Sequence, residues 1–108
     1  MLAAASAIRV DLGGELSEST TVRQLWQLYR AYLEEQGRAS STLERYDVVA
    51  ELFNTAFGER RLLEVTTSSV EAFLKDLGVA KGPSSMRTGR NVLSGMFRYA
   101  VNHDGQRN

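Results

Sequence analysis

The sequence contains no cysteine, one proline and one histidine. Without cysteine the chain forms neither a disulfide framework nor a thiolate metal site, and it lacks a cysteine nucleophile. No apolar run approaches the roughly 18 residues that a membrane-spanning helix needs. Residues 1–8 are too short for a signal peptide and lack its leading positive charge. These absences predict a cytoplasmic protein with no membrane partner.

Groups that carry chemistry are also scarce. Gly13-Gly14 lacks the lysine and the helix that would make it a phosphate-binding loop. The single histidine, His103, falls in the last turn of a predicted helix, where the helix dipole accounts for it. The acidic residues Glu44, Asp47 and Glu51 follow one another as a solvated stripe. We therefore expect no catalytic residue, no bound metal and no cofactor.

The length and the charge distribution point to one small domain with a basic end. The chain has 108 residues, of which 43% are hydrophobic and 24% charged, as in an ordinary globular domain. Its net charge is zero, but residues 1–80 hold 8 basic and 12 acidic side chains. Residues 81–108 hold five basic side chains against Asp104 alone. An anionic partner is expected to bind at this basic end.

Apolar periodicity predicts an all-α fold. Residues 1–19 show no sustained period and are expected to be a flexible N-terminal leader. Helices are predicted over 21–36, 41–57, 67–77 and 85–102. Capping residues mark three starts and glycines mark three ends: Thr21 with Gln24, Ser41 with Glu44, and Thr66 or Ser68 at the starts; Gly37, Gly58 and Gly78 at the ends. The predicted core contains Leu25, Tyr29, Leu52, Phe53, Phe73, Leu93 and Phe97, with Leu43, Tyr46, Val49, Ala56 and Phe57 also on the apolar face of the second helix.

The fourth predicted helix carries a polar stripe. At 100° per residue, four of its side chains fall within about 60° of one another, namely Arg87, Asn91, Ser94 and Arg98. Ser84 and Arg90 flank the stripe, Lys81 precedes the helix, and the apolar side chains Met86, Leu93, Met96, Phe97 and Ala100 lie opposite. Arg and Asn suit guanine and adenine edges, while Ser and further arginines suit phosphate. The alternative is an ordinary solvent-exposed helix face. The stripe contains no acid, which favours nucleic-acid binding over that alternative.

A second basic and hydroxyl-rich cluster surrounds the start of the second helix. It consists of Arg38, Ser40, Ser41, Thr42 and Arg45. The free N–H groups of a helix N-terminus bind phosphate readily. Capping of the helix accounts for Ser41 by itself, and it is compatible with a phosphate contact.

The order of these features resembles the core-binding domain of tyrosine recombinases, the phage-integrase type. The resemblance covers residues 21 to about 105. It rests on Thr21-Val22 through Tyr29 and Leu33, Ser41-Thr42-Leu43 with Tyr46 and Phe57-Gly58, Leu63-Glu64-Val65-Thr66 leading into Val70 and Phe73-Leu74, and Arg90-Asn91-Val92-Leu93-Ser94 with Phe97-Arg98-Tyr99-Ala100-Val101.

This resemblance implies a four-helix, SAM-like orthogonal bundle over residues 20–105 that grips one side of a recombination core site on double-stranded DNA. It also implies that residues 106–108 begin a linker to a catalytic domain of the same polypeptide, and that other recombinase protomers are partners on DNA. Tyr99 lies in the part that matches the core-binding helix and is not expected to be the nucleophile. The domain is therefore expected to bind DNA specifically and to cleave nothing.

Two alternatives stay open. The first is a helical protein-interaction module of SAM or death-domain type, because fold does not fix function. The second is a helix-turn-helix regulator. The acid-free stripe favours DNA over a protein partner, and the long sequence gap between the two basic clusters disfavours a compact helix-turn-helix.

Overall fold

The computed structural model describes residues 16–17 and 19–107, with side chains described as far as residue 102. Four α-helices, α1 (Val22–Glu35), α2 (Ser40–Phe57), α3 (Thr67–Lys81) and α4 (Pro83–Arg107), make up the fold, with a 3₁₀ turn, η1 (Leu62–Glu64). The β-pairing in this part of the chain is one isolated bridge between Thr21 and Arg61. The predicted all-α four-helix bundle is confirmed. None of the described helices is both long and apolar enough to cross a membrane.

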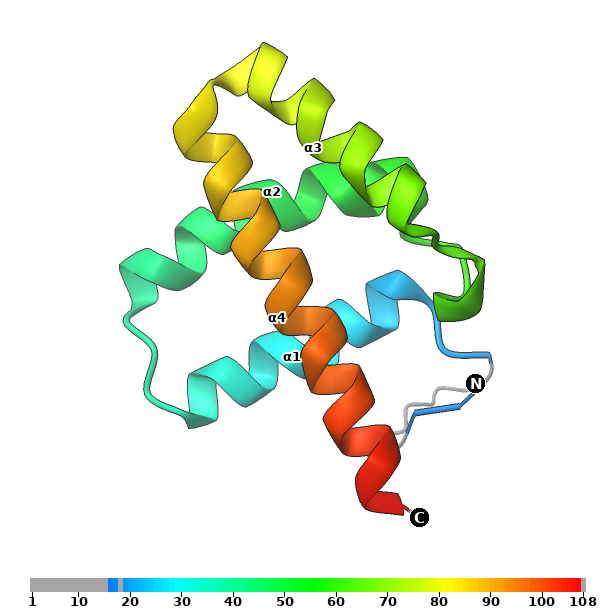
Figure 1. Cartoon of the computed structure of the whole chain (residues 1–108). Helices are drawn as coiled ribbons and strands as arrows, with labels where there is room; N and C mark the ends of the chain where they lie inside the picture. Colours follow the sequence, from blue (N-terminus) through cyan, green and yellow to red (C-terminus); the bar gives the residue numbers. More distant parts are fainter. Residues whose placement is uncertain (1–15, 18, 108) are drawn as a thin grey trace.

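The central element is α4, which packs on all three other helices and most extensively on α3. In Figure 1 it crosses over α2 and then over α1, while α3 leads back to its start. Close approach depends on Gly89, where a Cβ would come 2.8 Å from the Leu77 Cδ2 atom of α3. The side of α4 that faces away from the three helices remains for solvent or a partner.

The helix starts differ in how they are capped. In α1 the Thr21 Oγ1 atom accepts from the Gln24 N–H at 3.2 Å, and Gln24 Oε1 accepts from the Thr21 N–H at 2.9 Å. In α3 the Thr66 Oγ1 atom accepts from the Ser69 N–H at 3.1 Å. These two predicted caps are confirmed.

The predicted cap of α2 by Ser41 with Glu44 is wrong. The helix begins at Ser40, and its N-cap is Ala39, whose side chain has no acceptor for a capping bond. Only Arg38 and Ala39 separate the turn at Gly37 from the helix, and the Ala39 carbonyl already accepts from the Leu43 N–H. Ser41 therefore lies inside the first turn rather than before it.

The glycines also differ in role. Gly37 stops α1 with a left-handed φ of 81°, as predicted. Gly78 does not end α3, which continues to Lys81 and ends at Gly82 with a φ of 100°. Gly78 stays helical and serves packing instead, because a Cβ there would come 3.0 Å from the Met86 sulfur of α4. Pro83 then opens α4 at the first helical position, which its fixed φ suits.

The helix α4 is longer than predicted at both ends. It begins two residues before the expected Ser85 and runs through Arg107, beyond the expected end at 102 and into the predicted linker start at 106–108. Residue 108 and the side chain of His103 lie outside the described part of the chain.

The core is formed by one face of each helix. Its fully buried large side chains are Phe53, Leu25, Leu33, Leu74, Leu93, Met96, Val22 and Val92. Tyr29 is also buried, and Phe73 and Phe97 pack half-buried against the core. The prediction was wrong for Leu52 and Ala56, which are exposed. Val49, Phe53 and Phe57 define the buried face of α2, and Leu52 lies one 100° step away from Phe53.

The end of the predicted leader belongs to the fold. Leu16 is buried in the core, and the Ser17 N–H donates to Thr20 Oγ1 at 2.9 Å. The Thr20 carbonyl in turn accepts from the Leu62 N–H at 3.2 Å. The expectation of a flexible leader reaching residue 19 is thus corrected at Leu16, Ser17 and Ser19. Residues 1–15 and 18 lie outside the described part of the chain.

Candidate nucleic-acid interface

The polar stripe predicted on the last helix is the exposed side of α4. Arg87, Asn91, Ser94 and Arg98 are all exposed, and Leu93, on the opposite side, is buried. Ser84, Val101 and Asn102 extend this surface along the helix, and it includes no acid. We call the exposed residues Ser84, Arg87, Asn91, Ser94, Arg98, Val101 and Asn102 the α4 face.

The α4 face carries unpaired positive charge. Neither Arg87 nor Arg98 forms an ion pair with the described residues. A guanidinium group without an internal partner keeps its donors directed at solvent, where they are available to phosphate or to a base edge. The face can therefore bind an anion without first breaking an internal bond.

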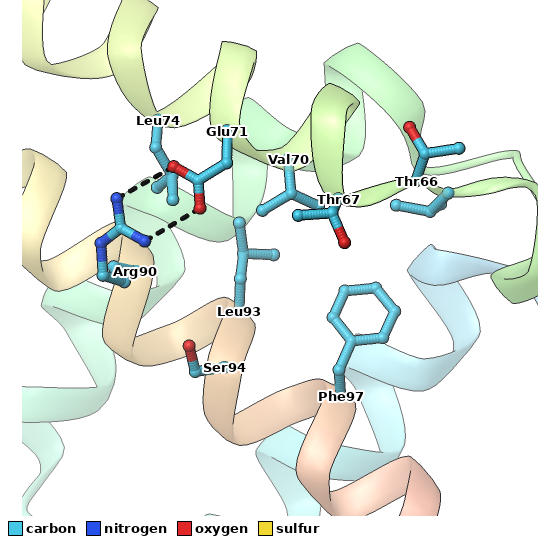
Figure 2. A pocket seen from close by; sticks show the side chains of 10 residues that line it. Thr66, Thr67, Val70, Glu71, Leu74, Arg90, Leu93, Ser94 and Phe97 are labelled. Atoms are coloured by element: carbon cyan, nitrogen blue, oxygen red, sulfur yellow. Dashed lines mark hydrogen bonds and ion pairs between the residues drawn. The ribbon is translucent and has the colours of Figure 1, made fainter.

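Arg90, at the edge of the α4 face, is different because it has an internal partner. Its Nη1 and Nη2 atoms donate to the two carboxylate oxygens of Glu71 on α3, at 3.0 and 3.1 Å (Figure 2). This pairing raises the pKa of Arg90 and lowers the pKa of the Glu71 carboxyl. The sequence pattern placed no acid beside the stripe, whereas the fold brings one to this edge.

A groove of about 330 Å³ separates the start of α3 from α4, beside the α4 face. Figure 2 shows Phe97, Val70 and Thr67 around it, with Ser94 and Arg90 at the side of α4. The sequence pattern does not predict this groove. It depends on the tertiary packing of two helices, and its only sequence signal is that Val70 and Phe97 lie at the border of their apolar faces.

The cluster at the start of α2 is also solvent-exposed. Arg38, Ser40, Ser41 and Arg45 are exposed, and Thr42 is half-buried. Since Ala39 supplies no capping group, no side chain caps the first N–H groups of this helix. An uncapped helix start beside two arginines combines free donors with positive charge.

One arginine of each basic cluster, Arg38 and Arg98, influences the electrostatics of Tyr29. Burial raises the pKa of Tyr29, while the charges of Arg38 and Arg98 act on the same hydroxyl in the opposite direction. The Arg38 N–H donates to the Leu33 carbonyl on the helix of Tyr29, and the Tyr29 hydroxyl lies against Gly95 of α4, so the two clusters belong to adjoining segments. Lys81 is exposed at the end of α3, next to the α3–α4 turn, and Ser84 begins the α4 face on the other side of that turn.

No family model, no curated protein and no solved structure matches this chain. Within the described residues, no group of three or more His, Asp or Glu side chains is placed to hold a metal ion.

Proposed function

We propose that this domain binds double-stranded DNA sequence-specifically, with the α4 face and the start of α2 against the duplex. The observation that carries the proposal is the α4 face itself, an exposed helical surface with no acid and with two arginines that form no ion pair within the described part of the chain. Duplex DNA presents one negative charge per roughly 1.7 Å of its axis, so such a surface gains affinity by releasing counterions.

The dimensions of α4 suit this role. An α-helix is about 10–12 Å across with its side chains, close to the roughly 12 Å width of the DNA major groove. From Arg87 to Arg98 the face extends about 16 Å at 1.5 Å per residue. Arg87 and Asn91 are the side-chain types that pair with guanine and adenine, whereas Ser94 and Arg98 suit phosphate. The start of α2 would hold a second phosphate and fix the orientation.

We further propose that the domain is the non-catalytic half of the clamp of a tyrosine recombinase. What supports this is the resemblance over residues 21–105 together with the four-helix architecture. Under this proposal the site is a recombination core site, and a catalytic domain of the same polypeptide and other protomers complete the assembly. This domain itself binds and does not cleave, and its affinity alone is weak and falls with salt.

The test compares two exposed arginines by fluorescence anisotropy on a labelled random duplex and a recombination core site. Arg87→Ala is expected to weaken binding, and Arg60→Ala, in the turn after α2, serves as its charge-matched control. Arg23 is unsuitable as a control because it is bound to Glu59 at 2.7 Å. A base contact predicts a loss of about 1–3 kcal/mol on the core site only. Equal binding by both variants would contradict the proposal.

A protein-interaction module is the second candidate, and one observation favours it. Val48 and Leu52, one helical turn apart on the outer side of α2, are 60% and 36% exposed. Two neighbouring exposed apolar side chains can contribute to a protein interface. This surface lies on α2 and does not overlap the α4 face, so substitutions separate the two functions.

A further inference from the structure

Tyr29 carries a hydroxyl group that the fold holds in place without using it. Its ring lies within 6.3 Å of the rings of Trp26, Tyr32 and Tyr99, and the side chain is only 8% exposed. The hydroxyl makes no hydrogen bond to the described residues. Among the described residues, the only fully buried side-chain N or O atom without a hydrogen-bond partner is Asn54 Oδ1, so the Tyr29 hydroxyl is not fully buried. The hydroxyl therefore retains access to solvent and has a free donor.

The position of this hydroxyl is set by Gly95 of α4. A Cβ atom at residue 95 would overlap the Tyr29 hydroxyl, so the phenol lies directly on the α4 backbone. On the helical wheel Gly95 borders the α4 face, and Arg98 follows it by one turn. The hydroxyl thus emerges at the edge of the face that we propose to contact DNA.

Arg38, in the other cluster, lies just after α1, the helix that carries Tyr29. Its backbone N–H donates to the carbonyl of Leu33, one turn beyond Tyr29 on α1, at 3.1 Å. Arg38 and Arg98 are also the two cations whose charges act on the pKa of Tyr29. Burial nevertheless raises that pKa above its ordinary value, so the hydroxyl stays protonated at neutral pH and remains a donor.

We propose that the Tyr29 hydroxyl and the guanidinium groups of Arg38 and Arg98 together bind one backbone phosphate of DNA. This inference rests on the proposed function and adds to it the point at which the two basic clusters share a ligand. A phosphate has several acceptor oxygens, which suits one neutral and two charged donors. The contact carries no sequence information and fixes the position of α4 along the duplex.

The test is Tyr29→Phe, which removes the hydroxyl and keeps the packed ring. On a random duplex we expect a loss of affinity of about threefold to tenfold, the range of one net hydrogen bond. The dependence of affinity on salt stays the same, because the hydroxyl neutralises no charge. Arg98→Ala, in contrast, lowers the salt slope by about one. Tyr32→Phe, which removes a hydroxyl from the same aromatic cluster, is the matched control and is expected to bind like the parent.

A double-mutant cycle excludes a merely structural effect. If both side chains hold one phosphate, Tyr29→Phe costs less than about twofold in the Arg98→Ala background. Thermal unfolding of each variant shows that the fold is retained. Parental binding by Tyr29→Phe, or an equal loss in both backgrounds, would overturn the shared phosphate and leave the proposed function standing. A parent protein that binds no duplex at low salt would overturn both.

Discussion

Two groups of arginines in this domain differ in what they contact. Around α1 and η1, Arg23, Arg30 and Arg61 each pair with a carboxylate, and Arg30 binds both oxygens of Asp47, at 2.7 and 2.8 Å. On the α4 face, Arg87 and Arg98 have no such partner among the described residues. The first group is bound to acids of the fold, whereas the second is open to an external anion. The comparison teaches that net charge alone does not separate arginines held by acids of the fold from arginines open to an external anion.

The largest expected effect concerns the support beneath the α4 face. Leu93 is 2% exposed and packs opposite the arginines. Replacing it by alanine leaves a cavity, and we expect Leu93→Ala to lower the free energy of unfolding by about 2–5 kcal/mol. Denaturant unfolding measures this. A loss below about 1 kcal/mol would show that the face does not depend on this packing.

Arg87 is expected to behave in the opposite way. Arg87→Ala changes stability by less than about 0.5 kcal/mol, because the side chain is exposed and unpaired. Its cost appears in DNA binding instead, at about 1–3 kcal/mol if it contacts a base. Anisotropy titration and thermal unfolding of one protein preparation separate the two. Destabilisation without a binding defect would place Arg87 with the arginines that pair within the fold, such as Arg30.

Arg30 is the reciprocal case. It is 29% exposed and binds Asp47 with two bonds and Glu34 with a third at 2.9 Å. We expect Arg30→Ala to lower stability by about 1 kcal/mol, the upper part of the range for a partly exposed pair. DNA affinity at a temperature well below unfolding is expected to stay at the parental value. A reduced salt slope in this variant would instead assign Arg30 to the interface.

Arg90 shares features of both groups, because it lies at the edge of the α4 face and is paired with Glu71. Its availability to DNA therefore depends on that carboxylate. Glu71→Gln removes the competing carboxylate, so we expect affinity for a random duplex to rise about two- to threefold, with a steeper salt dependence. Asp76→Asn removes the same charge elsewhere on α3 and is the control. The Glu71 pKa is lowered in the folded protein, so the pair is present at neutral pH and is lost as pH falls through that lowered pKa. Acidification is thus expected to reduce the advantage of Glu71→Gln.

The smallest effect is expected on the outer side of α2. Val48→Ser replaces an exposed apolar side chain and is predicted to change both stability and DNA affinity by less than about 0.5 kcal/mol. If instead it disrupts a self-association detected by sedimentation, the protein-interaction alternative gains support.

The sequence was informative where a property depends on local spacing. The exposed side of α4 follows from the helical period, and the capping boxes at Thr21 and Thr66 follow from three-residue spacings. Gly78 and Leu52 were mispredicted because their environments depend on other parts of the fold. Met86 of α4 packs on Gly78, which stays helical. On α2, fewer of the apolar side chains are buried than the sequence pattern suggests, and Leu52 is one of those left exposed.

The arrangement of the candidate interface depended still more on the tertiary fold. Glu71 reaches Arg90 from another helix, 19 residues away. The contact of Tyr29 with Gly95 of α4, beside the bond from Arg38 to the Leu33 carbonyl, requires three segments to meet and a glycine at residue 95. No spacing within one helix indicates either arrangement.

The most direct test of the central claim is a map of backbone amide NMR signals during titration with a random duplex of about two helical turns. We predict shifts that concentrate on the α4 face and at Arg38–Thr42, and that diminish as salt is added. The amides of Val48, Leu52 and Thr55, on the outer side of α2, are expected to stay in place. Shifts confined to that outer side of α2, or no shifts at low salt, would contradict the account.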